Sequence, residues 1–128
     1  MSLKKTLRVM IVDDMSVSRG LITQCLEALE IWNVDEDASA ESALRKIAAN
    51  PVHLVISDYN MPNMDGLQLL QCLRQNRLTQ RTGFILVTGS PTPQIVDTGR
   101  KLGMNNMLKK PFSTAQMKHA IEAVVGRL

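Results

Sequence analysis

Short apolar runs alternate along this 128-residue chain with segments whose apolar residues recur at helical spacing. A continuous apolar run of about four to eight residues, rich in Val and Ile, is typical of a strand buried on both faces. The predicted strands span 7–12, 32–38, 53–57, 83–88 and 106–109. The pattern of 32–38 is weaker, so we expect this strand towards an edge of the sheet, with Trp32 packing there.

A helical pattern follows each predicted strand. The predicted helices span 16–29, 39–50, 67–76, 90–103 and 113–128. Asp65 is placed to cap the third of these helices, and Ser113 with Gln116 forms a capping-box pattern at the fifth. Continuous apolar strands need helices on both sides, so the fold class is α/β, with a doubly wound parallel sheet of five strands.

The size and composition fit one domain. A chain of 128 residues lies within the usual range for a single domain, and we expect 1–128 to form one, with its core at about 7–127. No apolar run approaches the roughly 20 residues that span a bilayer, so no membrane insertion is expected. Cys25 and Cys72 lack CxxC spacing, which favours reduced thiols and a cytoplasmic location.

The charge is unevenly distributed along the chain. Residues 1–90 carry nine Lys/Arg and ten Asp/Glu, whereas residues 91–128 carry six Lys/Arg and two Asp/Glu. The total of +3 is too small to indicate direct nucleic-acid binding, and no basic run with interleaved aromatics is present. The basic C-terminal third is either a solvated helical face or a surface for a downstream protein partner of acidic character.

Polar residues follow four of the five predicted strands. Asp13 and Asp14 follow the first, Asp58 follows the third, Thr88 ends the fourth and Lys110 follows the fifth. In a parallel sheet these ends meet at one edge, where the functional crevice of such folds lies. Clustered carboxylates repel one another, and Mg²⁺ resolves that repulsion. With a Lys and a hydroxyl nearby, the group predicts a phosphoryl site in which a carboxylate is the nucleophile.

The residues around these positions resemble one known family. The segments IVDDMSVSR, ISDYNMPNMDG, LVTGS and LKKPF are similar to the motifs of the response-regulator receiver domain, the CheY-like family. The resemblance covers about 7–127. It implies a flavodoxin-like (βα)5 fold and a bacterial phosphoprotein of a two-component system. Such a domain is a signalling domain and not an enzyme, with at most self-phosphotransfer and autodephosphorylation.

The resemblance also assigns roles near the acidic residues. It implies that Asp58 is the phosphorylation site, carrying an aspartyl-phosphate. Asp13 and Asp14 are implied to hold Mg²⁺ together with Asp58, Asp13 through water. Asn60 occupies the position whose backbone carbonyl supplies another metal ligand.

Further roles fall on the loops after the strands. Thr88 resembles the switch hydroxyl that turns towards the phosphoryl group, and Lys110 resembles the lysine that pairs with that group. The family usually has a cis peptide where this chain has Lys110 and Pro111, which aims the amine inward. Pro62 and Gly66 shape the loop after the third strand and the start of the helix that follows.

Two positions depart from the family pattern. Met107 stands three residues before Lys110, where the family commonly has the Tyr or Phe of the output switch. Methionine can change rotamer and fill a cavity, but it has neither a ring nor a hydroxyl. Ser90 stands where some relatives have an acidic or bulky side chain, which would alter access to the phosphoryl group.

We therefore predict a stand-alone receiver that takes a phosphoryl group from a sensor histidine kinase or a phosphotransfer protein. The expected output surface comprises the helix 90–103, the strand 106–109 and the helix 113–128. No effector domain follows Leu128, so we expect output through contact with a protein. Arg19 is either an exposed helix residue or one that contacts the kinase.

Three alternatives remain open at this stage. An atypical receiver acting as a phosphate sink or scaffold is consistent with Met107. A phosphatase with an Asp nucleophile would use similar groups, but its first strand ends in DxD and this one ends in adjacent Asp13 and Asp14. A flavin carrier would need a hydroxyl- and Gly-rich loop after the first strand, where this chain has MSVSR.

Overall fold

The computed structural model describes residues 3–128, and within them five strands form one parallel sheet in the order β2-β1-β3-β4-β5. The strands are β1 (Val9–Val12), β2 (Val34–Asp37), β3 (Leu54–Asp58), β4 (Gly83–Thr88) and β5 (Asn106–Lys109). The predicted strand order along the chain and the doubly wound α/β class are confirmed. The weak strand lies at an edge, as expected.

Five of the helices follow the predicted strands in turn. They are α2 (Ser16–Ala28), α3 (Ala40–Ala49), α4 (Gly66–Gln75), α5 (Pro93–Lys101) and α6 (Thr114–Val125). Asp65 and Ser113 form complete capping boxes with Gln68 and Gln116, so both predicted caps are confirmed. A single turn, α1 (Leu3–Thr6), was not predicted, because four residues are too few to display an apolar period.

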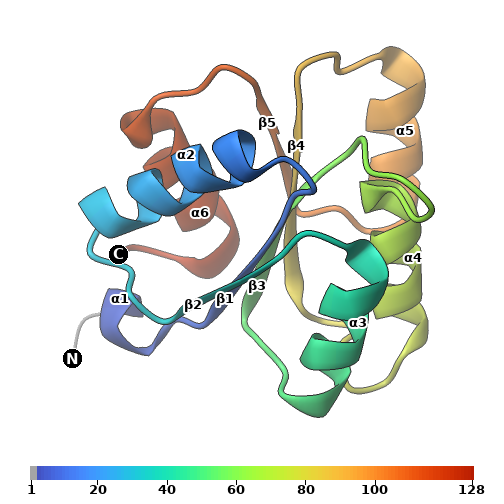
Figure 1. Ribbon diagram of the computed structural model, residues 1–128, viewed down its shortest axis with the longest axis horizontal. Coiled ribbons are helices and arrows are strands. Elements are labelled where there is room, and N and C mark those ends of the chain that lie inside the picture. The colour runs from blue at the N-terminus through green and yellow to red at the C-terminus, as the bar shows by residue number, and fades with distance from the viewer. Residues whose placement is uncertain (1–2) are drawn as a thin grey trace.

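The helices lie in two layers around the sheet. Figure 1 shows α2 and α6 on one side and α3, α4 and α5 on the other. Alternate residues of β1 point to these two layers: Val9 and Ile11 belong to the core under α2 and α6, and Met10 and Val12 to the other core. The strand is apolar at every position because both of its faces are covered. Of the helices in residues 3–128, none combines the length and apolar character that a membrane crossing requires.

The expected packing of Trp32 is wrong. The residue is 68% exposed, although it lies two residues before the edge strand β2. Its neighbour Ile31 is fully buried in the core under α2 and α6. Because Ile31 takes the inward position, the larger side chain of Trp32 is left facing solvent.

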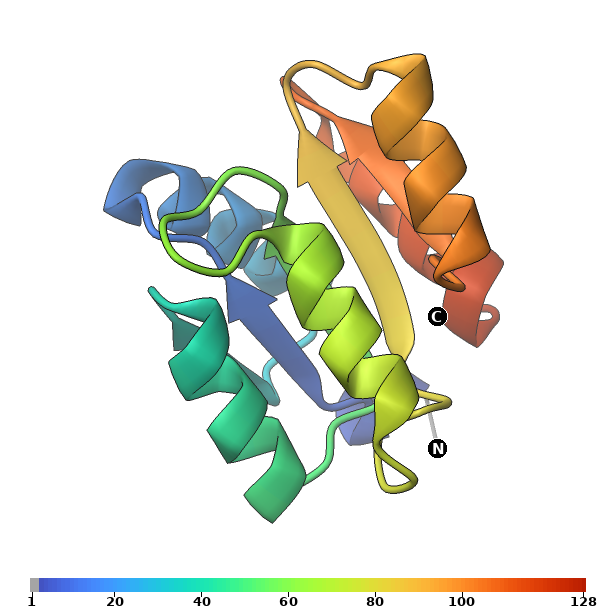
Figure 2. The same cartoon turned by 90° about the vertical axis from the view of Figure 1, so that its right-hand side faces the viewer.

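The carboxyl ends of the strands reach one edge of the sheet, and α4 begins close to that edge. Figure 2 shows α3, α4 and α5 side by side in front of the strands. Gly66, the first residue of α4, lies so close to β3 that a Cβ there would be 2.5 Å from the Asp58 carbonyl oxygen and 2.8 Å from Leu86 Cδ1. The missing side chain therefore allows α4 to start against the end of β3.

Replacing Gly66 by Ala should destabilise the fold by about 1–3 kcal/mol, because the backbone at Asp58 must move away from the added methyl group. Chemical denaturation measures this change in the free energy of unfolding. Gly20→Ala is the matched control, since Gly20 lies within α2 with nothing within 4 Å of its Cβ position. That change should stabilise the protein by about 0.5–1 kcal/mol through helix propensity. Equal effects of the two changes would contradict the close approach at Gly66.

Candidate functional site

Three carboxylates meet at the carboxyl edge of the sheet. Asp13 directly follows β1 and is fully buried, Asp58 is the last residue of β3 and is 7% exposed, and Asp14 is exposed. One oxygen from each lies within 4.8 Å of the other two. The parallel register explains the meeting, because Val12 pairs with Ser57 and the residues that follow them emerge together.

Lys110 supplies a positive charge between the two buried acids. Its Nζ lies 3.0 Å from Asp58 Oδ1 and 3.8 Å from Asp13 Oδ2. Its backbone N–H donates to the Thr88 carbonyl at 2.9 Å, which ties it to the end of β4. The peptide bond between Lys110 and Pro111 is cis, as the resemblance implies, while Lys109 is exposed.

The two oxygens of Asp13 have different environments. Oδ1 accepts a hydrogen bond from the Met15 N–H at 3.0 Å. Oδ2 is buried and accepts no hydrogen bond from any residue among 3–128. A buried carboxylate oxygen that accepts no hydrogen bond destabilises the fold unless a positive charge or a donor compensates for its lost hydration. The oxygen-rich cluster around it therefore fits a hard divalent cation such as Mg²⁺.

The electrostatics of Asp58 reflect its crowded position. Burial raises the pKa of this carboxyl above its ordinary value, and the negative charge of Asp13 raises the pKa further. The hydrogen bond and charge of Lys110 oppose both effects without cancelling them. The protein alone therefore compensates the negative charge of an ionised Asp58 only in part.

Thr88 is 5% exposed at the end of β4. Its Oγ1 accepts a hydrogen bond from the Ser90 N–H at 3.2 Å. This bond uses a lone pair of the oxygen, so the hydroxyl hydrogen remains able to donate to another group. The switch role of Thr88 stays a prediction.

The remaining predicted positions surround this centre or lie at its periphery. Asn60 and Pro62 lie in the exposed loop between β3 and α4, which closes where the Gly66 N–H donates to the Tyr59 carbonyl at 2.9 Å. Met107 is partly buried on β5 and packs against the core formed with α3, α4 and α5. It therefore packs on the side of the sheet that holds α3, α4 and α5.

Sequence reasoning placed Arg19 on an exposed face or in a kinase contact, and the structure gives it a different position. Its Nη1 donates to the Asp13 carbonyl at 2.6 Å, and its Nε pairs with Glu36 Oε1 at 2.9 Å. With 19% of its side chain exposed, Arg19 links α2 and β2 to the backbone of Asp13. The interpretation as an exposed helix residue is wrong; its place six residues after Asp13, on the inner face of α2, was the available signal.

A parallel five-stranded sheet with three acids and a lysine at its carboxyl edge defines the receiver class. The family model described as "Response regulator receiver domain" matches residues 9–122. The chain belongs to this family. Receiver domains are signalling domains that act with histidine kinases or phosphotransfer proteins and with downstream targets, and this protein is a receiver of phosphorelay signalling.

Individual relatives agree with this assignment. A probable chemotaxis protein CheY of Rhizobium etli is 41% identical over 128 residues, covering 100% of this chain and 99% of the relative. The structure of the Vibrio cholerae chemotaxis protein CheY4 gives a TM-score of 0.87 at 25% identity, covering 93% of this chain and 98% of the other. A response regulator structure from Chloroflexus aurantiacus gives 0.88 at 26% identity, with 94% and 98% covered. The phosphatase and flavin-carrier alternatives find no support among these relatives.

The raised pKa of Asp58 predicts how its removal changes stability with pH. A carboxyl whose pKa is higher in the folded state makes the protein less stable as pH rises. The loss begins near the unfolded pKa of 3.8 and is complete above the folded pKa. At neutral pH the buried charge is therefore a net penalty. Asp58→Asn should raise Tm at pH 7, on the order of 2–4 °C, and the gain should shrink towards pH 4.

Thermal melts between pH 4 and pH 8 measure this difference. Asp35→Asn is the control, because Asp35 is an exposed acid on the edge strand β2 and its removal makes the same change in net charge. A lower Tm for Asp58→Asn at pH 7, or a gain matched by Asp35→Asn, would contradict the proposed penalty.

Proposed function

We propose that Asp58 is the phosphoryl acceptor of a receiver domain comprising residues 1–128. The observation that supports this most strongly is the pairing of the buried Asp58 with Lys110 at 3.0 Å, beside two further carboxylates. A nucleophile for phosphoryl transfer needs positive charge around the oxygens that gain negative charge. The site provides a lysine, and its acids attract a cation.

In the proposed transfer, a carboxylate oxygen of Asp58 attacks the phosphorus of a phosphorylated histidine on the donor protein. An O–P bond forms, the N–P bond breaks, and the electron pair of that bond stays on the imidazole nitrogen. Lys110 neutralises negative charge next to Asp58 throughout. The Thr88 hydroxyl can donate its hydrogen to a phosphoryl oxygen once the product has formed.

The same proposal places Mg²⁺ among Asp13, Asp14, Asp58 and the backbone carbonyl of Asn60. When bound, the ion neutralises charge that gathers on the phosphoryl oxygens during transfer. The buried Asp13 Oδ2, which lacks a hydrogen-bond donor within residues 3–128, supports this placement. The roles of Pro62, Gly66 and Pro111 are to hold the surrounding loops in place.

Output in this proposal leaves through α5, β5 and α6. Thr88 and Lys110 are joined through the backbone, so a shift of Thr88 towards the phosphoryl group reaches β5 directly. Met107 packs from β5 against the core on the α5 side of the sheet, and this packing would change with that shift. The exposed bases Arg100, Lys101, Lys109 and Lys118 favour a protein target of acidic character.

The name of the Rhizobium etli relative supports a place in a chemotaxis system. Cys25 and Cys72 are free thiols, which supports the proposed cytoplasmic location. The proposal also limits catalysis by this chain to self-phosphotransfer and autodephosphorylation.

Incubation with acetyl phosphate and Mg²⁺ should add one phosphoryl group to the wild-type protein, and none to Asp58→Asn. Intact-mass spectrometry measures the gain directly. Asp14 and Asp13 are the nearest alternative acceptors, so peptide mapping after borohydride reduction locates the acyl phosphate. If the wild type gains no phosphoryl mass, or the variant gains as much, Asp58 is not the acceptor.

Mg²⁺ should raise the Tm of the wild type because it binds the folded state alone. At about ten times its dissociation constant, the ion adds about 1.4 kcal/mol of stability, or about 5 °C. Asp13→Asn should abolish most of this rise, whereas Asp97→Asn on the exposed surface of α5 should keep it. Differential scanning fluorimetry over a Mg²⁺ titration measures the shift, and an equal shift in both variants would place the ion elsewhere.

A further inference from the structure

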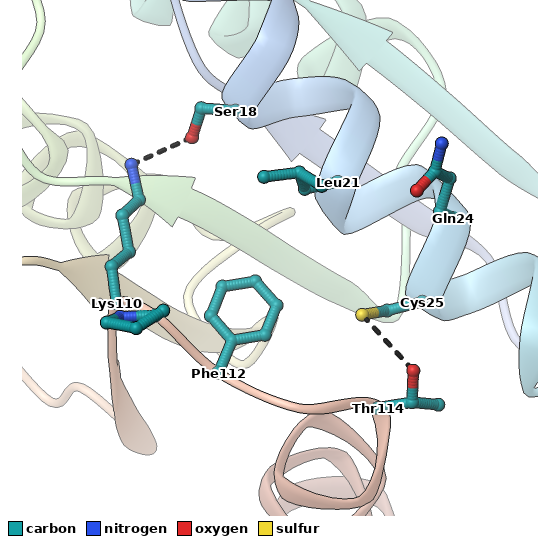
Figure 3. A pocket seen from close by; sticks show the side chains of 8 residues that line it. Ser18, Leu21, Gln24, Cys25, Lys110, Phe112 and Thr114 are labelled. Carbon is teal, nitrogen blue, oxygen red and sulfur yellow. Dashed lines mark hydrogen bonds between the residues drawn. The ribbon is translucent and has the colours of Figure 1, made fainter.

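The ammonium of Lys110 has a second short contact besides Asp58. Its Nζ donates to Ser18 Oγ at 2.8 Å, although the two residues are 92 positions apart in the sequence. Figure 3 shows this bond reaching from the loop after β5 to the first turn of α2. The contact to Ser18 is shorter than those to Asp58, at 3.0 Å, and Asp13, at 3.8 Å.

A lysine held by ion pairs alone keeps some of its freedom, because its four-carbon stem has many rotamers. The side chain of Lys110 is 29% exposed, so solvent competes for its donors. The short side chain of Ser18 is fixed by the helix, and its oxygen defines a second point to which Nζ is held. A neutral hydroxyl does this without adding negative charge to a site that already contains three carboxylates.

The surroundings give Lys110 room to move if that second point is lost. Ser18 and Lys110 line one end of a groove of about 480 Å³ between α2 and the β5–α6 loop. Leu21 and Phe112 line its apolar middle, as Figure 3 shows. An ammonium released from Ser18 could therefore turn away from Asp58 along the open side of the groove.

A separate contact joins the two walls of the groove further along. Thr114 Oγ1 donates to Cys25 Sγ at 3.6 Å, and this hydrogen bond involves neither Lys110 nor the acids. The attachment of the loop to α2 thus does not depend on Ser18 alone. Loss of the Ser18 hydroxyl should accordingly alter the position of Nζ more than the packing of the fold.

We propose that Ser18 is a positioning residue for phosphoryl transfer, whose hydroxyl holds the Lys110 ammonium against Asp58. The inference rests on the proposed role of Asp58 as acceptor. It assigns to α2 a direct part in the site: the helix sets where the positive charge lies when the phosphoryl group arrives. Because Lys110 is partly exposed and keeps its ion pair with Asp58, loss of the bond should slow phosphorylation about three- to tenfold.

The test follows phosphorylation by acetyl phosphate and Mg²⁺ with intact-mass time courses at several donor concentrations. Ser18→Ala should lower the limiting rate, and Ser18→Thr, which keeps the hydroxyl, should restore most of it. Two controls make matched changes: Ser16→Ala removes an exposed hydroxyl from the same turn, and Thr114→Ala breaks the other contact across the groove. Both should keep the wild-type rate, and melts should show similar Tm values throughout.

A double-mutant cycle separates positioning from a general effect on the fold. If Ser18 acts through Lys110, Ser18→Ala should have no further effect on the rate in a Lys110→Ala background. The proposal is overturned if Ser18→Ala keeps the wild-type rate, if Ser18→Thr is as slow as Ser18→Ala, or if the Ser18 effect persists without Lys110. These outcomes leave Asp58 as the acceptor, whereas a wild type that gains no phosphoryl group overturns the proposed function itself.

Discussion

Asp13 and Asp58 are buried side by side at the ends of two adjacent parallel strands. Much of the local structure reduces the electrostatic cost of burying these two carboxylates together. Each strand contributes its acid at the same level because their register is parallel. The charges raise each other's cost, and burial increases that cost by removing water. Lys110 offsets part of it, but Asp13 Oδ2 still lacks a donor within residues 3–128. The protein thus maintains a site whose electrostatics are completed by what binds there.

The groups around the two acids hold them by short contacts from several elements. Arg19 binds the carbonyl of Asp13 from α2, and Gly66 lets α4 approach the carbonyl of Asp58. Lys110 is held by its backbone at Thr88 and by its side chain at Ser18. Preorganised groups of this kind need not rearrange when charge develops, which is why they are effective in transfer reactions. The fold as a whole thus holds the two acids and Lys110 in fixed relative positions.

A change at the site would be transmitted to the surface through side-chain packing. Met107 belongs to the packed layer between β5 and α5, without the ring or hydroxyl that the family usually has at this position. A thioether adapts its shape to small displacements, since three torsions rotate with low barriers. Within the proposed function, a change at Thr88 would be passed on by repacking of this layer rather than by rotation of an aromatic ring.

The sequence by itself determined the fold class, the order of the elements and the convergence of Asp13, Asp58, Thr88 and Lys110. Continuous apolar runs and helical periodicity are local consequences of burial, so the sequence alone reveals them. The strands β4 and β5 coincide with the predicted ranges. The acids and the lysine were also predictable, because parallel topology alone brings strand ends together.

Only the tertiary structure decided which side chains touch across that edge. Four features depend on how each helix docks on the sheet: the bond from Lys110 to Ser18, the position of Arg19, the outward direction of Trp32, and the Asp13 oxygen that accepts no hydrogen bond from residues 3–128. Docking sets rotations and distances of a few ångströms between residues far apart in the chain. Periodicity specifies which face of a helix is buried, but it carries no information about the atom that each buried or half-buried side chain will meet.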